Sequence, residues 1–287
     1  MEPRSFFVPG GDGHQIHVLE WSTEGVPLIF VHGFGNTARI WDDAAAVVAP
    51  HYRTIAMDQR GHGDSDHDPE HRYAYDDLAR DLEAVVETLQ IERFVLVGHS
   101  LGGRTAMTFA EGNAERLAGL VIVDTGPEHD PRGSSRIRNE VEQRGDGTVA
   151  SLKEYEGILA HNYPASSPEV IRRMAAAELR ERDDGRWERK LDPTFFPGRA
   201  DMDEAAMEAH ERETSKRLWA VLEKIPCPTL VIRGAASDIL GPDVADRMVE
   251  EALPNGTLAV VGQASHSVMT DNPEGFNAAL AAFALGS

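Results

Sequence analysis

The chain has 287 residues, a length that predicts one or two domains at about 150 residues each. Its 28 Lys and Arg against 48 Asp and Glu give a net charge of −20, which disfavours binding to nucleic acid and to anionic membrane surfaces. The single cysteine excludes an intrachain disulfide and a cysteine-based metal cluster. No apolar run reaches the roughly 18 residues of a membrane-spanning helix, and the first residues lack the apolar stretch of a secretion signal, so we expect a cytoplasmic protein.

Strands and helices alternate along residues 1–125. The segment FFVPGGDGHQIHVLEW predicts an antiparallel hairpin that turns at Gly-Asp-Gly. Four short apolar runs follow, VPLIFVHG, YRTIAMD, RFVLVGHS and LAGLVIVDTG, and each is typical of a buried parallel strand. Helical patterns at 75–90 and 101–111 separate the last three runs. This alternation predicts an α/β fold with a mostly parallel sheet.

Residues 126–217 differ in composition from the chain on either side. They carry 20 acidic and 16 basic side chains, against 28 and 12 in the remainder, so they are densely charged but nearly balanced. RRMAAAELRERDDGRWERK and ADMDEAAMEAHERETSKRLWAVLEKI are rich in good helix formers. Strand patterns resume with PTLVIRG and TLAVVG, and helical patterns follow at 242–252 and 273–285. We therefore expect a core of residues 1–125 and 218–287, interrupted by a helical cap at 126–217.

The strongest chemical motif is Gly98-His99-Ser100-Leu101-Gly102, which follows a predicted strand and precedes a predicted helix. This is the G-x-S-x-G pattern of a nucleophile elbow in its strand–turn–helix context. Glycines are needed there because larger side chains would collide with the strand and the helix, while the serine is held in a strained turn. We expect Ser100 to be a nucleophile at the carboxyl edge of the sheet.

A second glycine-rich turn, His32-Gly33-Phe34-Gly35, ends an earlier strand. Where a serine sits on such an elbow, the oxyanion hole takes one N–H from the residue after the nucleophile and one from a turn of this kind. This predicts the backbone N–H groups of Phe34 and Leu101 as the oxyanion hole. His32 itself is expected to be a structural, hydrogen-bonding residue.

A serine hydroxyl needs a neighbouring base, and the base needs a carboxylate on its other ring nitrogen. His266 follows the strand pattern TLAVVG and is the expected base. Asp238 follows PTLVIRG and is the expected carboxylate, because the chain order Ser100, Asp238, His266 is then nucleophile, acid, base. Asp124, at the end of LAGLVIVDTG, remains an alternative acid, and His62 a lesser alternative base.

These motifs together resemble the α/β-hydrolase superfamily, through HGFG, DQRGHGDS, GHSLGG, RGAASD and ASHSVMTDNPEGF in this order. The resemblance covers both flanks of the inserted segment and implies an eight-stranded, mostly parallel sheet flanked by helices, with the insertion as a cap over the active site. Within DQRGHGDS we expect a tight structural turn in which Asp58 pairs with Arg60. Similar haloalkane dehalogenases and epoxide hydrolases carry Asp at the nucleophile position, where this chain has Ser100, so both activities are disfavoured.

We therefore expect a serine hydrolase that cleaves a small-molecule carboxylic ester or lactone through an acyl-enzyme on Ser100, with no metal and no organic cofactor required. The alternatives are a carbon–carbon bond hydrolase that acts on a ring-fission diketone acid, and a non-catalytic ligand receptor on the same fold. An acidic substrate would need an arginine near the nucleophile, either Arg104 or an arginine of the cap. The sequence does not predict an oligomeric state.

We expect a mostly apolar substrate pocket with a few polar points. The residues predicted to line it are His32, Gly33, Phe34, His99, Ile239 and Met269. The aromatic residues of the cap region are candidates for an apolar wall but are expected mainly in the core of the cap: Tyr155, Tyr163, Trp187, Phe195, Phe196 and Trp219.

Overall fold

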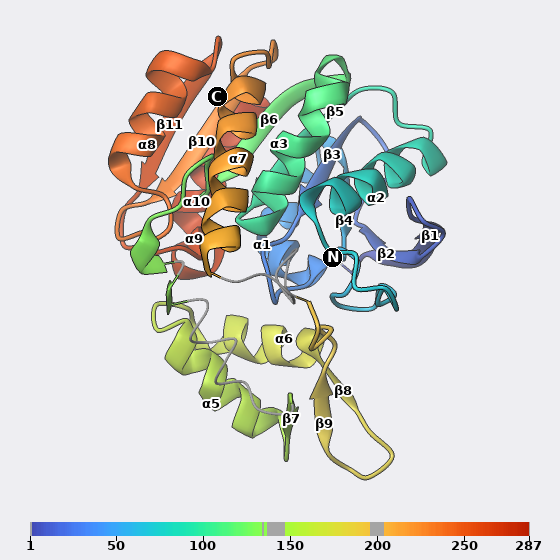
Figure 1. The fold of residues 1–287 in the computed structure, drawn as a ribbon. Helices are drawn as coiled ribbons and strands as arrows, with labels where there is room; N and C mark the ends of the chain where they lie inside the picture. The colour runs from blue at the N-terminus through green and yellow to red at the C-terminus, as the bar shows by residue number, and fades with distance from the viewer. Residues whose placement is uncertain (1, 134, 137–146, 196–203, 287) are drawn as a thin grey trace.

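The computed structural model describes residues 2–133, 135–136, 147–195 and 204–286, and its core is an eight-stranded sheet (Figure 1). The strands lie in the order β1-β2-β4-β3-β5-β6-β10-β11. β2 pairs antiparallel with β1 and with β4, and the other neighbours pair in parallel. The strands are β1 Arg4–Pro9, β2 Gln15–Glu20, β3 Val26–Val31, β4 Tyr52–Met57, β5 Phe94–His99, β6 Leu117–Val123, β10 Thr229–Gly234 and β11 Gly256–Val261. The predicted hairpin and the mostly parallel sheet are confirmed.

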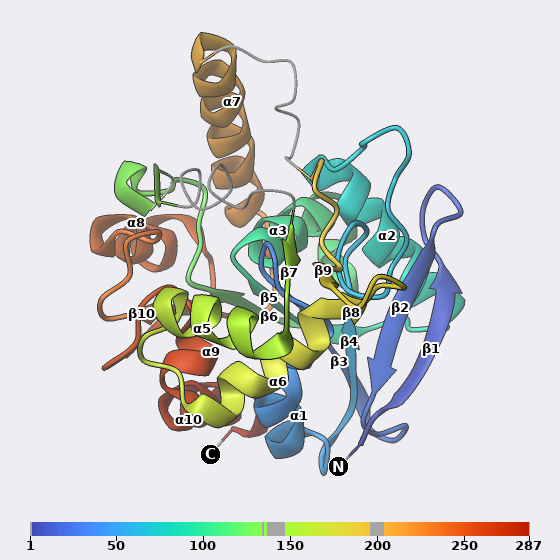
Figure 2. The same cartoon turned by 90° about the horizontal axis from the view of Figure 1, so that it is seen from below.

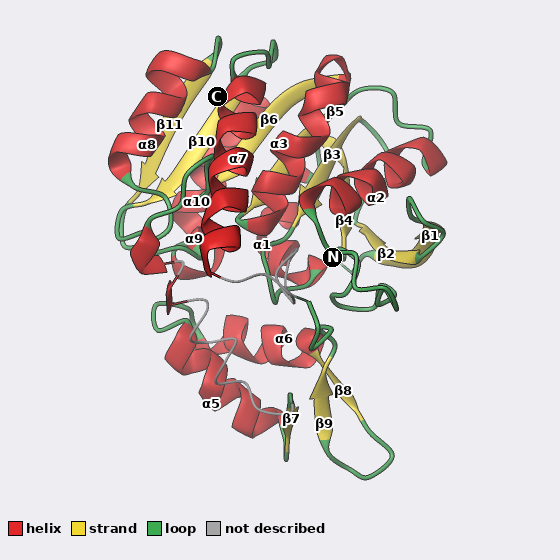
Figure 3. Cartoon of the chain, in the orientation of Figure 1, coloured by secondary structure: helices red, strands yellow, loops and turns green. Residues whose placement is uncertain are grey.

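Helices cover both faces of this sheet (Figure 3). On one face α2, α3, α7 and α8 pack over an apolar core that includes Leu82, Met107 and Leu218, and on the other α1, α9 and α10 pack over a core that includes Trp41 and Phe276. The helices are α1 Asp42–Val48, α2 Tyr75–Thr88, α3 Leu101–Asn113, α7 Glu204–Leu222, α8 Pro242–Arg247, α9 Val268–Asp271 and α10 Pro273–Leu285. Short helical turns lie at η1 Ala38–Trp41, η2 Ala114–Arg116 and η3 Met248–Ala252.

The apolar strand sequences follow from this two-sided burial. In β3, Leu28 and Phe30 belong to the core on one face, while Ile29 and Val31 belong to the core on the other. Successive side chains of a strand point to opposite faces, so a strand covered on both sides needs an unbroken apolar run. Such apolar runs are the reason that the sequence predicts these parallel strands.

A smaller lobe lies at the carboxyl ends of the parallel strands (Figure 2). It contains α5 Leu152–Asn162, α6 Pro168–Glu178 and a three-stranded antiparallel sheet in the order β7-β9-β8. The strands are β7 Thr148–Val149, β8 Leu179–Glu181 and β9 Trp187–Arg189. The lobe has an apolar cluster of its own, built around Tyr155, Leu159, Ile171 and Met174.

The helical character predicted for RRMAAAELRERDDGRWERK is wrong after Glu178. There α6 ends, and β8 and β9 form a hairpin around residues 183–185, where Gly185 has a φ of +78°. Asp-Asp-Gly supplies this turn because glycine adopts positive φ without steric cost. Trp187 packs against the apolar cluster of the lobe from β9, so tertiary packing overrides the helix propensity of the flanking Glu and Arg residues.

α7 returns the chain from the lobe to the core. Arg104 of α3 donates two hydrogen bonds to Glu211 of α7, at 3.0 and 2.7 Å, and Leu218 and Leu222 are buried in the core. The predicted boundary after residue 217 therefore falls inside this helix, and the division into core and cap stays a prediction. Among the described residues, no helix has both the length and the apolar character needed to cross a membrane.

The turn at 58–65 has a structural role, but its predicted ion pair is not formed. Asp58 accepts the backbone N–H of Ala38 at 2.6 Å and the Nδ1 of His17 at 2.7 Å, whereas the guanidinium of Arg60 pairs with Asp81 at 2.5 Å. Burial raises the pKa of Asp58, but its hydrogen bonds and the neighbouring histidines outweigh burial and leave the pKa below its ordinary value.

Candidate active site

Ser100 occupies the turn between β5 and α3. Its backbone has φ +52° and ψ −114°, which L residues rarely adopt, and the residue is buried. A Cβ on Gly98 would lie 2.3 Å from the carbonyl oxygen of Gly102, and a Cβ on Gly102 would lie 2.3 Å from that of Val31. Both close approaches explain why this strand–turn–helix junction needs glycine around the serine.

His266, in the loop after β11, lies beside Ser100. Its Nε2 is 2.9 Å from the Oγ of Ser100, and its Nδ1 is 2.9 Å from Oδ2 of Asp124. When Nδ1–H donates to the carboxylate, Nε2 carries the lone pair that accepts the serine proton. The structure thus brings together the serine and the histidine that the sequence singled out.

The carboxylate beside His266 is Asp124 and not Asp238. Asp124 follows β6, is completely buried and has a φ of +48°. Its Oδ1 accepts the backbone N–H of Gly234 at 2.8 Å, and its Oδ2 accepts the hydroxyl of Ser237 at 2.5 Å as well as the histidine. The expected contact between Asp238 and His266 is therefore not formed, and the alternative acid takes that position.

Asp238 lies in the loop after β10, where it is held by Arg136 from the inserted segment. Its Oδ2 accepts Nε of Arg136 at 2.7 Å, and its Oδ1 accepts Nη2 at 3.0 Å. This bidentate pair lowers the pKa of Asp238 below its ordinary value, although partial burial opposes the shift. Sequence reasoning missed Ser237 and Arg136, because Arg136 comes from 102 residues away and a serine next to an aspartate carries no signal of its own.

The glycine turn after β3 lies directly against the elbow. A Cβ on Gly33 would lie 2.5 Å from Nδ1 of His99 and 3.2 Å from Cβ of Ser100. Phe34 follows in this turn and lines the same cavity as the serine. Leu101 is the first residue of α3, and N–H groups at the start of a helix have no acceptor within the helix. Both backbone groups predicted for an oxyanion hole are therefore near the serine.

The histidine inside the elbow supports the loop that carries His266. Nε2 of His99 donates to the backbone carbonyl of His266 at 3.0 Å. Burial, together with the neighbouring His266 ring, lowers the pKa of His99 well below its ordinary value. His99 is therefore neutral, and it fixes the backbone position of the base from inside the elbow.

Two other buried histidines lie further from the serine. Nε2 of His32 accepts the backbone N–H of Gln59 at 3.0 Å, which fits the structural role predicted for it. His62, the lesser candidate base, packs edge-on against Phe195 with ring centroids 4.5 Å apart. Burial lowers the pKa of both rings, that of His62 strongly. The position of a base next to the serine is taken by His266, so His62 does not fill it.

A cavity of about 1320 Å³ opens beside Ser100 and is lined from both the core and the smaller lobe. Of the predicted pocket residues, Phe34 and His99 line it. The others lie outside its wall, where Met269 packs into the core and Ile239 is buried: His32, Gly33, Ile239 and Met269. Charged and polar side chains of the inserted segment interrupt the apolar wall, among them Arg136, Glu154, His161, Glu178 and Arg189. The wall is therefore more polar than the sequence predicted.

The aromatic residues of the cap region divide between the cavity and the apolar clusters. Tyr155 and Tyr163 line the cavity. Three others pack in or against apolar clusters: Trp187, Phe195 and Trp219. Phe196 lies outside the described residues.

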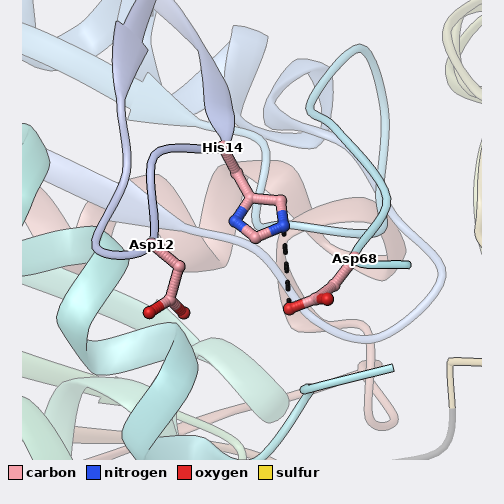
Figure 4. A group of neighbouring side chains, drawn as sticks. All are labelled: Asp12, His14 and Asp68. Carbon is pink, nitrogen blue, oxygen red and sulfur yellow. Dashed lines mark ion pairs between the residues drawn. The ribbon is translucent and has the colours of Figure 1, made fainter. Parts of the chain in front are cut away.

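Side chains with metal-ligand chemistry also meet away from the serine. Asp12, His14 and Asp68 bring ligand atoms within 4.8 Å of one another, and Nε2 of His14 lies 3.6 Å from Asp68 (Figure 4). The buried guanidinium of Arg60 lies 2.9 Å from Asp12 and 3.1 Å from Asp68. Because this guanidinium already supplies the positive charge, the cluster is explained as an ion-pair network around buried Arg60 and not as a cation site.

The fold and the arrangement at Ser100 define the class of protein. A mostly parallel eight-stranded sheet with helices on both faces carries a serine on a strained strand-to-helix turn, next to a histidine and a buried aspartate. The sequence model of the alpha/beta hydrolase fold matches residues 26–273. The chain belongs to the α/β-hydrolase fold family.

Several characterised relatives are similar along most of their length. The chain is 28% identical over 250 residues to 2-(acetamidomethylene)succinate hydrolase of Mesorhizobium japonicum, covering 87% of this chain and 84% of the relative. It is 27% identical to a non-heme chloroperoxidase of Streptomyces lividans, covering 96% of this chain and 98% of the relative. The crystal structure of an α/β hydrolase from Novosphingobium aromaticivorans matches with a TM-score of 0.80 at 28% identity, covering 97% of this chain and 96% of that structure. These similarities support a hydrolase, while the reactions named for the relatives differ.

Proposed function

We propose that this protein is a serine hydrolase that cleaves a carboxylic ester or lactone through an acyl-enzyme on Ser100. The observation that carries the proposal is the continuous hydrogen-bond chain from Ser100 through His266 to Asp124, with both links at 2.9 Å. A serine hydroxyl is a weak nucleophile at neutral pH unless a base removes its proton. The two donors on Asp124, the N–H of Gly234 and the hydroxyl of Ser237, hold its buried carboxylate in the orientation that faces the histidine.

In the first half of the reaction, Nε2 of His266 takes the hydroxyl proton as Oγ of Ser100 attacks the substrate carbonyl. Asp124 stabilises the imidazolium that forms. The negative charge that develops on the carbonyl oxygen is directed at the backbone N–H groups of Phe34 and Leu101. One such donor contributes a factor of about 10²–10³ to the rate.

In the second half, the tetrahedral intermediate collapses and the leaving alcohol takes its proton from His266. A water molecule then attacks the ester of Ser100, with His266 again as the base, and releases the carboxylic acid. The reaction consumes one water and yields one acid and one alcohol, or a hydroxy acid when the substrate is a lactone.

The cavity of about 1320 Å³ is large enough for a substrate of small to medium size, since pockets that bind such ligands span about 300–1,000 Å³. One relative is named as a hydrolase of a succinate derivative. Substrates that carry a carboxylate therefore belong in the test panel beside neutral esters and lactones of increasing chain length.

The test is covalent labelling of Ser100 by a fluorophosphonate together with hydrolysis of p-nitrophenyl esters. Ser100→Ala is expected to lose both while keeping its thermal unfolding midpoint within a few degrees. Ser5→Ala, which removes a hydroxyl from β1, serves as the matched control and keeps both. Turnover by Ser100→Ala near the wild-type rate would overturn the proposal.

The same experiment separates the two alternatives. Labelling of Ser100 with turnover only of a ring-fission diketone acid would identify a carbon–carbon bond hydrolase. Failure to label, with tight binding of an intact ligand, would identify a receptor.

A further inference from the structure

One arginine of the cavity wall lacks a carboxylate partner within the described part of the chain. Among the described residues, three arginines line the cavity, and Arg132 and Arg136 are each paired at 2.7 Å, with Asp130 and Asp238. Arg189, in β9 of the smaller lobe, has no carboxylate of the described chain within ion-pair distance. Its positive charge is therefore not balanced by the described side chains at the wall of the cavity.

The hydrogen-bond donors of Arg189 are also largely unused. Its Nε is buried without a hydrogen-bond partner in the described ranges, and its Nη2 makes a long contact of 3.4 Å with the carbonyl oxygen of Gly35. The guanidinium carbon lies 5.6 Å from the centroid of the Tyr155 ring, a cation–π contact that steadies the group without satisfying its N–H donors. Buried polar groups are nearly always hydrogen-bonded, so this guanidinium is suited to an acceptor supplied by a ligand.

One carboxylate of the cavity wall, Glu178, is engaged by the tyrosine that stacks on Arg189. Glu178 accepts the hydroxyl of Tyr155 at 2.6 Å. Burial, reinforced by the charge of Glu178, raises the pKa of Tyr155 well above its ordinary value. The phenol therefore stays protonated and continues to donate to Glu178. Among the described residues Glu178 forms no ion pair with Arg189, so an anionic ligand could pair with this guanidinium.

The position of Arg189 relates it to the proposed reaction. The carbonyl that its Nη2 contacts belongs to Gly35, the residue directly after Phe34. The N–H of Phe34 is one of the two proposed oxyanion donors. The guanidinium therefore contacts the same turn that carries a proposed oxyanion donor, and it lines the same cavity as Ser100.

We propose that Arg189 is the binding site for a substrate carboxylate, and that the substrates this enzyme prefers are half-esters of short dicarboxylic acids. The inference rests on the serine-hydrolase function proposed above. A guanidinium presents two parallel N–H groups that match the two oxygens of a carboxylate. Attack by Ser100 on the ester end releases the alcohol, and hydrolysis of the acyl-enzyme releases the dicarboxylate, with one water consumed.

The kinetic experiment compares monoethyl glutarate with ethyl 5-oxohexanoate, in which a neutral methyl ketone replaces the carboxylate at the same length. Ester cleavage is followed by proton release for wild type and for Arg189→Gln. We expect wild type to favour the half-ester by about 10- to 100-fold in kcat/KM, mostly through KM, since a charge-assisted bidentate contact is of this size. Arg189→Gln is expected to remove the preference while leaving kcat/KM for the neutral ester within about threefold.

Two further variants separate a specific contact from general charge and from misfolding. Arg186→Gln removes an exposed charge from the same hairpin and is expected to keep the preference. Arg189→Lys keeps the charge but loses the planar fork, so it is expected to retain part of it. Equal kcat/KM of wild type for both esters, or an equal loss of preference in Arg186→Gln, would overturn the carboxylate site and leave the serine-hydrolase proposal intact.

A binding measurement covers the case in which neither ester is turned over. Calorimetric titration of glutarate into Ser100→Ala, and into the double variant Ser100→Ala/Arg189→Gln, reports on the site without catalysis. Saturable binding that falls at least tenfold in the double variant supports the site. Absence of binding to Ser100→Ala overturns it. If the wild type is not labelled by the fluorophosphonate, by contrast, that result counts against the proposed serine-hydrolase function alone.

Discussion

Replacing Asp124 with Asn tests which acid serves His266. The substitution keeps the shape of the side chain but removes its charge and one acceptor. The Oδ1 of Asp124 accepts the N–H of Gly234, and Oδ2 accepts both Ser237 and His266. If the oxygen of the new amide stays on Gly234, its NH₂ group faces Nδ1 of His266. The ring is then driven to the tautomer with its proton on Nε2, where it cannot accept the proton of the serine.

The expected loss is large at Asp124 and small at Asp238. A wrong tautomer in a serine triad lowers kcat by about 10⁴, which corresponds to about 5–6 kcal/mol of transition-state stabilisation. Asp238→Asn breaks only the ion pair with Arg136. The side chain of Asp238 is 33% exposed and that of Arg136 is 41% exposed. Exposed pairs contribute at most about 1 kcal/mol, so we expect a change of no more than about fivefold. The two variants should therefore differ by at least three orders of magnitude.

The assay is kcat on the best ester of the panel, with the active fraction counted by fluorophosphonate titration and folding checked by thermal unfolding. The reasoning is refuted if Asp238→Asn loses more than about 10³ in kcat while Asp124→Asn loses less than tenfold. That outcome would mean that the loop after β10 rearranges to bring Asp238 onto the histidine. A similar large loss in both variants would instead show that the pair with Arg136 is needed to hold this loop in place.

Gly33→Ala places a Cβ 2.5 Å from a histidine nitrogen of the elbow, so we expect kcat to fall at least tenfold. Gly112→Ala, whose Cβ meets no atom of the described chain within 4 Å, should keep kcat and raise stability by up to about 1 kcal/mol; an equal kcat in both variants would count against the first expectation. Glu211→Gln removes the charge that faces buried Arg104 at 2.7 Å, and because the side chain of Glu211 is 34% exposed we expect a loss of about 1–2 kcal/mol, seen as a lower midpoint in thermal unfolding. Asp58→Asn removes a carboxyl whose pKa is lowered in the folded protein, so its contribution is present above its unfolded pKa of about 3.9 and is lost as pH falls below that value. Urea unfolding should find this variant less stable at pH 7 and less sensitive to acid between pH 5 and 3 than wild type, and parallel pH profiles would contradict the assignment.

The sheet was predictable because its information is local. Most parallel strands are buried on both faces and so appear as apolar runs, and β5 is buried at every residue. The edge strand β11 is only partly buried. The elbow was predictable because its pattern is local, and the close approach of Gly98 is to Gly102 in the same turn. Gly102, in contrast, lies against Val31 of β3. Ser100 and His266 each follow a parallel strand, β5 and β11, and the carboxyl ends of parallel strands share one edge of the sheet.

What the sequence left open depends on contacts between distant segments. The β8–β9 hairpin forms where a helix was expected, because Trp187 packs into the apolar cluster of the smaller lobe. That Arg189 meets no carboxylate of the described chain likewise has no sequence signal, since neighbouring positions such as Glu188 are acidic. In the fold, Glu188 pairs with Arg180 across the hairpin at 2.6 Å, and Arg189 points to the other face of the strand.

The choice between the two acids shows how such long-range contacts decide a site. β6 and β10 are parallel neighbours, and the N–H of Asp124 bonds to the carbonyl of Ile232 at 2.7 Å. Both acids therefore leave the same edge of the sheet, and a pattern of strands followed by acids cannot separate them. Asp124 comes directly after its strand, whereas Asp238 lies further along the loop that follows Gly234. The last residue of β10 and the loop after it instead give Asp124 two donors, the N–H of Gly234 and the hydroxyl of Ser237.

Those donors make a fully buried carboxylate tolerable at Asp124, because a buried charge is stable only when it is hydrogen-bonded. Asp238 is left at the rim of the cavity, where it pairs with Arg136 of the inserted segment. The loop after β10 thus has two roles: it orients the acid of the proposed triad through Ser237, and it ties the inserted segment to the core through Asp238. Since both contacts belong to one loop, a displacement of that loop would change both the ion pair with the inserted segment and the hydrogen bond that orients the acid.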